Sequence, residues 1–120
     1  EAVKALMHAY RAFAEQNPGV YAATIPTPPR SDREWSAAVD RLMATFVAAL
    51  QTYEFRGPDT IHALRALRSL VHGFVSLEGA GALKNPVDRD ESFAWLVDAF
   101  LMTLDKAAST HPKRRAEATP

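Results

Sequence analysis

The side chains of this sequence best suited to catalysis or metal binding are 4 histidines and 14 carboxylates, and the chain contains no cysteine. The lack of Cys excludes a disulfide framework, a Cys-ligated metal and a thiol nucleophile. His62 and His72 are ten residues apart and share only one broad side of a helix, and the sequence shows no set of histidines and carboxylates that obviously converges on a metal. The glycine-rich phosphate loop, the Gly-x-Ser-x-Gly elbow and the His-Glu-x-x-His motif do not occur. We therefore expect no enzyme, no bound metal and no cofactor.

Two polar residues of one predicted helix still call for an explanation. His72 precedes Gly73 within a helical pattern, where Gly costs about 1 kcal/mol relative to Ala, so the pair indicates a close helix crossing. His72 is then either a hydrogen-bonded packing residue or a residue beside a ligand cavity. Glu78 falls inside an apolar arc, so its carboxylate either reaches water at the helix end or joins a polar network or ligand pocket. Catalysis by His72 together with Glu78 is the least supported alternative.

The elements that must position these residues are predicted to be helices. Apolar residues recur at spacings of three and four, which predicts four main helices over residues 1–17, 31–56, 59–79 and 89–108. Residues 18–25 add a short connecting helix. The predicted fold class is all-α, a bundle of four main helices plus this short helix.

Local signals set the ends of these helices. Ser31 with Glu34, and Asp88 with Glu91, have the spacing of capping boxes at helix starts. Gly57 before Pro58 predicts a helix stop. Arg11 is expected outside the apolar stripe of the first helix.

The third and fourth main helices carry more apolar surface than one contact face needs. The apolar arc of residues 59–79 covers about 200° on a helical wheel, which predicts a central position. In the last helix, Trp95, Ala99 and Met102 lie opposite the main apolar stripe. A second apolar face bearing Trp indicates a partner surface.

Composition and charge limit the classes of function. A chain of 120 residues fits one domain, and 48% hydrophobic content indicates a folded, soluble protein. Formal net charge is +0, which argues against direct binding of nucleic acid or an anionic membrane. We read residues 111–120, including the basic cluster 113–115, as a disordered, solvated tail. A cytoplasmic location fits the lack of Cys.

One segment resembles a known family. Residues 64–83 read LRALRSLVHGFVSLEGAGAL, and residues 85–101 read NPVDRDESFAWLVDAFL. This segment is similar to the C-terminal domain of tetracycline-repressor-like (TetR) transcriptional regulators, most of all to the subgroup named for a Trp-His-Gly motif. His72 and Gly73 match the last two positions of that motif, and Val71 stands in place of its Trp. The resemblance covers residues 1–108, because the first helix and residues 17–21 are similar to the segment that follows the DNA-binding region.

The resemblance implies that residues 1–110 form an effector-binding and dimerisation domain, and that the N-terminal helix-turn-helix lies outside this chain. It also implies a homodimer in which the last two helices form a dimeric four-helix bundle, and a small hydrophobic effector that alters the DNA affinity of the helix-turn-helix. DNA is then a partner only through that missing domain. The alternative is a helical protein–protein interaction module without a small-molecule pocket.

Two sets of candidate residues follow. Bulky and polar side chains that can line a cavity between helices are candidates for the ligand pocket: Met7, Tyr10, Tyr21, Trp35, Met43, Phe46, His72 and Glu78. Residues of the last two helices are candidates for the dimer interface: Ser69, Gly73, Ser76, Trp95, Ala99 and Met102.

Overall fold

In the computed structural model the chain is a set of helices, and the described residues include no strand. The structure describes residues 1–23 and 32–118, except the side chains of Val20, Ala23, Trp35 and residues 110–118. The helices are α1 (Ala2–Gln16), α2 (Pro18–Ala23), α3 (Arg33–Gln51), α4 (Asp59–Gly79) and α5 (Arg89–Ala118). The prediction of an all-helical chain with four main helices is confirmed. In the part of the chain that is described, no helix is long and apolar enough to cross a membrane.

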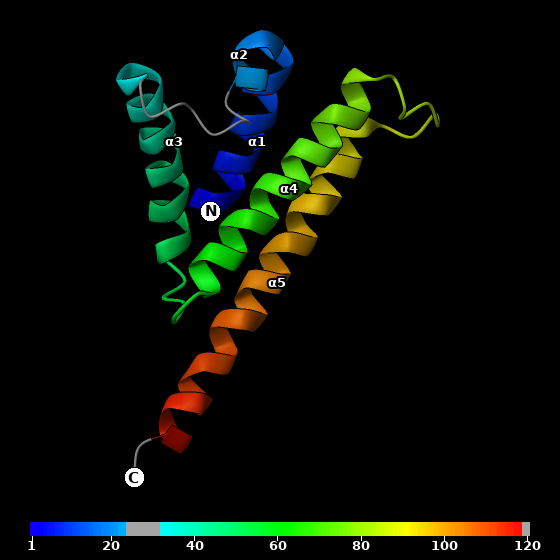
Figure 1. The fold of residues 1–120 in the computed structure, drawn as a ribbon. Helices are drawn as coiled ribbons and strands as arrows, with labels where there is room; N and C mark the ends of the chain where they lie inside the picture. Colours follow the sequence, from blue (N-terminus) through cyan, green and yellow to red (C-terminus); the bar gives the residue numbers. More distant parts are fainter. Residues whose placement is uncertain (24–31, 119–120) are drawn as a thin grey trace.

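The core lies where α1, α3 and α5 meet α4. Figure 1 shows α4 and α5 side by side and running in opposite directions, with α1 and α3 on the other side of α4. The predicted central position of α4 is confirmed, because it packs against α1, α3 and α5. The largest fully buried side chains come from all four main helices: Val3, Met7, Phe46, Leu50, Leu67, Val71, Phe93 and Val97.

Capping interactions fix the connection between α4 and α5. Gly81 adopts φ +70°, which an L side chain rarely tolerates. The amide of Ala82 donates to the Leu77 carbonyl and the amide of Gly81 to the Glu78 carbonyl, which is the Schellman pattern of a helix end. At the start of α5, Asp88 Oδ1 accepts a hydrogen bond of 3.0 Å from the Asp90 amide. The start predicted from Asp88 is therefore confirmed.

Two helix ends differ from the sequence prediction, and one predicted helix start lies outside the described residues. Helix α3 ends at Gln51, well before Gly57, because the chain turns through Glu54, whose φ is +53°. Helix α5 continues to Ala118, whereas the sequence pattern predicted an end near residue 108 and a tail from residue 111. The apolar pattern marks where packing against the other helices ends, and it does not determine where the backbone helix itself ends. Ser31, the predicted cap of α3, lies outside the described residues.

Candidate functional site

Arg11 is the only charged residue that is buried in the part of the chain the structure describes. Helix α1 places it one turn after Met7 and one turn before Ala14, on the face that packs into the core. The prediction that Arg11 lies outside the apolar stripe is therefore wrong. A wheel based on hydropathy places any Arg on the solvent side, but the aliphatic stem of Arg can be buried if the guanidinium finds partners.

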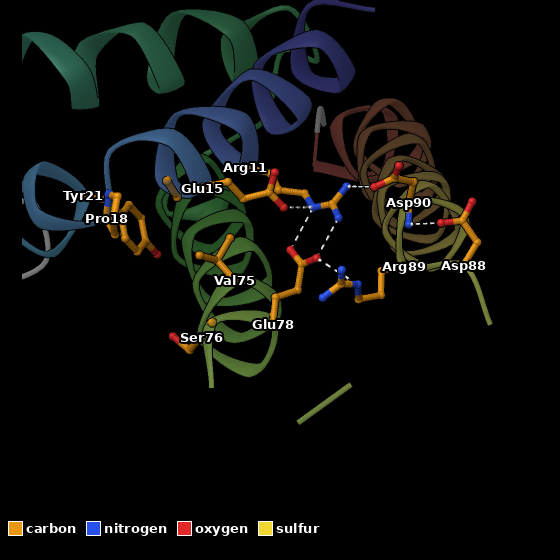
Figure 2. Close-up of a pocket in the computed structure, with 12 residues that line it drawn as sticks. Arg11, Glu15, Pro18, Tyr21, Val75, Ser76, Glu78, Asp88, Arg89 and Asp90 are labelled. Atoms are coloured by element: carbon orange, nitrogen blue, oxygen red, sulfur yellow. Dashed lines mark hydrogen bonds and ion pairs between the residues drawn. The ribbon is translucent and has the colours of Figure 1, made fainter. Parts of the chain in front are cut away.

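The partners of Arg11 come from α4 and α5. Its Nε and Nη2 donate to the two carboxylate oxygens of Glu78, at 3.1 and 2.9 Å, and its Nη1 donates to Asp90 Oδ1 at 2.8 Å. The guanidinium carbon lies 5.1 Å from the ring centre of Phe74 and 5.0 Å from that of Phe93. One side chain of α1 thus binds both α4 and α5, as Figure 2 shows.

Two further charges complete what we call the Arg11 cluster: Arg11, Glu15, Glu78, Arg89 and Asp90. Glu15 Oε1 lies 3.2 Å from Arg11 Nε, and Arg89 Nε lies 3.8 Å from Glu78 Oε2. Hydrogen bonds from Arg11 hold the pKa of Glu78 below its ordinary value, despite the opposing effect of burial. For Glu15 burial is the largest influence, and it raises the pKa.

A groove of about 790 Å³ opens beside the Arg11 cluster, between α1, α2, the end of α4 and the start of α5. Its volume is within the range of small-molecule sites, about 300 to 1,000 Å³. Apolar and charged residues share its lining, which consists of Arg11, Ala14, Glu15, Pro18, Tyr21, Val75, Ser76, Glu78, Gly79, Asp88, Arg89 and Asp90.

A second, smaller cavity of about 220 Å³ lies further along the same side of α4. It is lined by Tyr10, Tyr21, Arg65, Arg68, Ser69 and His72. The Tyr21 hydroxyl and His72 Nδ1 form a hydrogen bond of 2.8 Å, which joins α2 to α4. His72 is therefore hydrogen-bonded and lines a cavity, but it is exposed and is not packed into the core, and a contact with a ligand stays a prediction.

The outer surface shared by α4 and α5 carries exposed apolar side chains that no described residue of the chain covers. Trp95 and Met102 of α5 are 76% and 71% exposed. A shallow hollow of about 430 Å³ runs between the two helices, and Leu70 and Ala99 are among the residues that line it. Leu77 of α4 is 49% exposed. We call this surface the α4–α5 face.

The structure separates the predicted ligand residues into three groups. Tyr10, Tyr21, His72 and Glu78 line the groove or the smaller cavity. Met7 and Phe46 are fully buried, Met43 is half-buried against the core, and these three line neither cavity. The side chain of Trp35 lies outside the described part of the structure.

The predicted interface residues also divide. Trp95, Ala99 and Met102 lie together on α5, around a hollow of about 490 Å³. A β-carbon built on Gly73 meets nothing within 4 Å, so the close crossing inferred for Gly73 is not made within this chain. Ser69 lines the smaller cavity and Ser76 the groove, on the side of α4 that faces Tyr21.

Sequence reasoning missed Arg11 and the apolar residues Leu70 and Leu77 on the outer surface of α4. The available signal for Arg11 was Glu78, because a carboxylate within an apolar arc requires a cation from another helix. The apolar arc predicted for residues 59–79 is wider than one contact face needs, but it did not single out Leu70 and Leu77, since a wheel does not separate a core face from a second interface beside it.

The chemistry that these residues support is binding and charge pairing. Among the side chains that the structure describes, no three of His, Asp or Glu are grouped so that they could hold a metal ion. The Arg11 cluster instead ties three helices together at the edge of a cavity large enough for a small molecule.

Comparison with known proteins gives consistent matches. A family model described as the tetracyclin repressor-like, C-terminal domain matches residues 3–100. The chain is 34% identical over 98 residues to the uncharacterized HTH-type transcriptional regulator Rv0681 of Mycobacterium tuberculosis, covering 81% of this chain and 44% of that protein. It is 34% identical over 104 residues to the uncharacterized HTH-type transcriptional regulator YobS of Bacillus subtilis, covering 86% of this chain and 53% of that protein. The chain spans about half the length of the curated relatives it matches.

Proposed function

The chain belongs to the family of tetracyclin repressor-like C-terminal domains, and on that premise we propose that it is the effector-binding and homodimerisation domain of a transcription regulator. Both relatives are described as helix-turn-helix regulators of about twice its length. In this proposal a helix-turn-helix outside these 120 residues binds DNA, and the regulator acts in the cytoplasm. The neutral charge of the chain fits a part that does not itself bind DNA. Membership of the Trp-His-Gly subgroup stays a prediction.

The single observation that carries the proposal is the α4–α5 face. Large exposed apolar surfaces are uncommon on monomers, and Trp and Met are enriched at the centres of protein interfaces. Trp95 and Met102 are exposed on α5, and Leu70 and Leu77 continue the apolar surface onto α4. The occupant we propose is a second copy of the chain, because two antiparallel helix pairs related by a two-fold axis close into a four-helix bundle.

Gly73 supports this occupant. Gly in the middle of a helix lowers stability, so its presence calls for a reason. Among the described residues, nothing lies within 4 Å of a β-carbon built on Gly73, and Gly73 lies one turn from both Leu70 and Leu77. A partner helix that crosses close to α4 at this point would provide the reason.

The groove beside the Arg11 cluster is the proposed effector site. Ala14, Tyr21 and Val75 offer apolar contact to the body of a small hydrophobic effector. The charged residues at the edge of the groove favour an effector that also carries a polar group.

The Arg11 cluster gives a route from this site to the dimer. Arg11 joins α1 to the same two helices that carry the α4–α5 face. An effector that binds one arrangement of α1 against α4 and α5 more tightly than another shifts the population toward that arrangement. In the whole protein this shift would change the spacing of two DNA-binding domains and therefore the DNA affinity.

Ser76→Trp tests the effector site. Ser76 is exposed and lines the groove, so a Trp there should fill the groove without removing core packing. Thermal unfolding is followed with a library of small hydrophobic and amphipathic molecules, since a ligand of the folded state raises the melting temperature. We expect the library to contain a molecule that raises the melting temperature of the unchanged chain but not that of Ser76→Trp. The same molecule should stabilise the control variant Thr45→Trp, which changes an exposed position on α3.

Three results would contradict parts of the proposal. A molecule that stabilises Ser76→Trp as much as the unchanged chain binds elsewhere, and the groove is then not its site. A dimer that forms without any such molecule in a broad library favours the alternative, an interaction module without a small-molecule pocket. Loss of the dimer in Ser76→Trp would place Ser76 in the interface, as the sequence predicted, and would move the interface away from Leu70.

A further inference from the structure

The smaller cavity on α4 is lined by hydrogen-bond donors and aromatic rings and by no carboxylate. Helix α4 contributes four lining residues at the spacing of one helix side: Arg65, Arg68, Ser69 and His72. Tyr10 of α1 and Tyr21 of α2 form the rest of the lining, and both are buried. The groove beside the Arg11 cluster differs, because four carboxylates line it.

The positive charge at this cavity is not compensated nearby. Residues 60–77 of α4 include Arg65 and Arg68 but no Asp or Glu. In the described part of the chain, no ion pair joins either arginine to a carboxylate. Glu78, which follows this stretch, is already paired with Arg11. Two guanidinium groups therefore face a cavity without a counter-charge.

Tyr21 and His72 add a positioned donor. The hydroxyl of Tyr21 and His72 Nδ1 are 2.8 Å apart. When Tyr21 donates to Nδ1, the ring proton of His72 is on Nε2, which is then a donor. Burial raises the pKa of Tyr21 and outweighs the opposing charge of Arg68, so the hydroxyl keeps its proton.

We propose that this cavity is a binding site for an anionic group, a carboxylate or a phosphate, held by Arg65, Arg68 and His72. Guanidinium groups bind both kinds of oxyanion through paired, charge-assisted hydrogen bonds. The volume of about 220 Å³ admits one such group with a small body against Tyr10 and Tyr21. The proposal does not rest on the groove being the effector site, because Tyr21 alone lines both spaces.

Titrations of the chain with inorganic phosphate and with benzoate, at constant ionic strength, test the proposal. The side-chain resonances of His72 are followed by NMR, and heats of binding by calorimetry. We expect saturable binding of at least one anion, with His72 among the resonances that move. Tighter phosphate binding identifies a phosphate-bearing ligand, and tighter benzoate binding identifies a carboxylate on an aromatic body.

Arg65→Gln and Arg68→Gln should each weaken the binding by roughly tenfold or more, the value of one charge-assisted hydrogen bond. Arg41→Gln is the matched control, since Arg41 is exposed on α3 and lines neither cavity. Arg65 is also exposed, so Arg65→Gln provides the test even if the half-buried Arg68 proves necessary for folding. The proposal is overturned if neither anion saturates, if His72 does not respond, or if Arg41→Gln weakens binding as much as Arg65→Gln.

Discussion

Replacing Arg11 with Met is predicted to destabilise the fold strongly at neutral pH. Met keeps an unbranched apolar stem against Phe74 and Phe93 but removes the charge that pairs with Glu78. The side chain of Glu78 is only 9% exposed. Its carboxylate would therefore lose both hydrogen bonds from Arg11 without gaining full hydration.

The expected loss follows from the burial of each partner. Removing one member of a buried ion pair costs about 3 to 5 kcal/mol. Asp90 is 80% exposed and Glu15 46% exposed, so water replaces Arg11 for both of them, and only Glu78 contributes fully. Because the groove admits some water to Glu78, the expected loss in the free energy of unfolding is about 3 kcal/mol, at the lower end of this range. For a domain of this size the melting temperature should fall by about 10 to 15 °C.

The stability that the Arg11–Glu78 pair contributes should depend on pH in one direction. The pKa of Glu78 in the folded chain is held below its ordinary value by Arg11, so this pair stabilises the fold above the unfolded-state pKa. That contribution is lost as pH falls through the folded-state pKa, below about 4.5. In Arg11→Met, burial raises the pKa of Glu78, and protonation removes the unpaired charge. The difference in stability between the two chains should therefore shrink on acidification.

Thermal and urea unfolding at one fixed protein concentration measures this difference. Lys4→Met is the matched control, because Lys4 is an exposed cation on the same helix. The double variant Arg11→Met/Glu78→Met should recover part of the lost stability. Equal stabilities for Arg11→Met and Lys4→Met, or purely additive losses in the double variant, would refute the buried-pair reasoning.

Three further predictions concern single side chains. Phe46→Ala should lower the free energy of unfolding by about 3 to 5 kcal/mol, because Phe46 is fully buried and lines neither cavity. A loss below about 1 kcal/mol in urea unfolding would contradict its place in the core and favour its predicted place in the ligand pocket. Tyr21→Phe should lower the free energy of unfolding by about 0.5 to 1.5 kcal/mol, because the hydrogen bond to His72 is lost. The NMR signals of the His72 ring should shift in this variant, and unchanged signals would contradict the hydrogen bond. Gly73→Ala should favour the helix by about 1 kcal/mol within one chain but weaken the dimer, and tighter dimerisation in sedimentation equilibrium would show that no partner helix crosses there.

The helices could be predicted because local signals determine them. Spacings of three and four residues located all four main helices, and Asp88 marked the start of α5. The end of α4 was predicted at residue 79, beside the Schellman pattern that the structure shows. Each of these features depends on residues within a few positions of one another.

The cluster around Arg11 could not be predicted in the same way. Arg11 and Glu78 are 67 positions apart, and their meeting depends on how α1 crosses α4. Hydropathy assigned Arg11 to solvent, and for Glu78 the sequence left open whether its carboxylate reaches water or joins a polar network or ligand pocket. The sequence did distinguish the second apolar face of α5, because Trp95 and Met102 lie opposite the stripe that includes Phe93. It also made Ser69 and Ser76 of α4 candidates for the interface, and in the structure these two serines line the cavities that Tyr21 also lines.

The mass of the chain in solution tests the central claim most directly. Size-exclusion chromatography with multi-angle light scattering, at micromolar concentration, should give twice the chain mass of 13.2 kDa. Trp95→Ala should shift the mass toward that of a single chain, while Phe13→Ala, which removes an exposed aromatic residue of α1, should leave it unchanged. A mass of 13.2 kDa for the unchanged chain, unaffected by Trp95→Ala, would contradict the dimer and with it the account of the α4–α5 face.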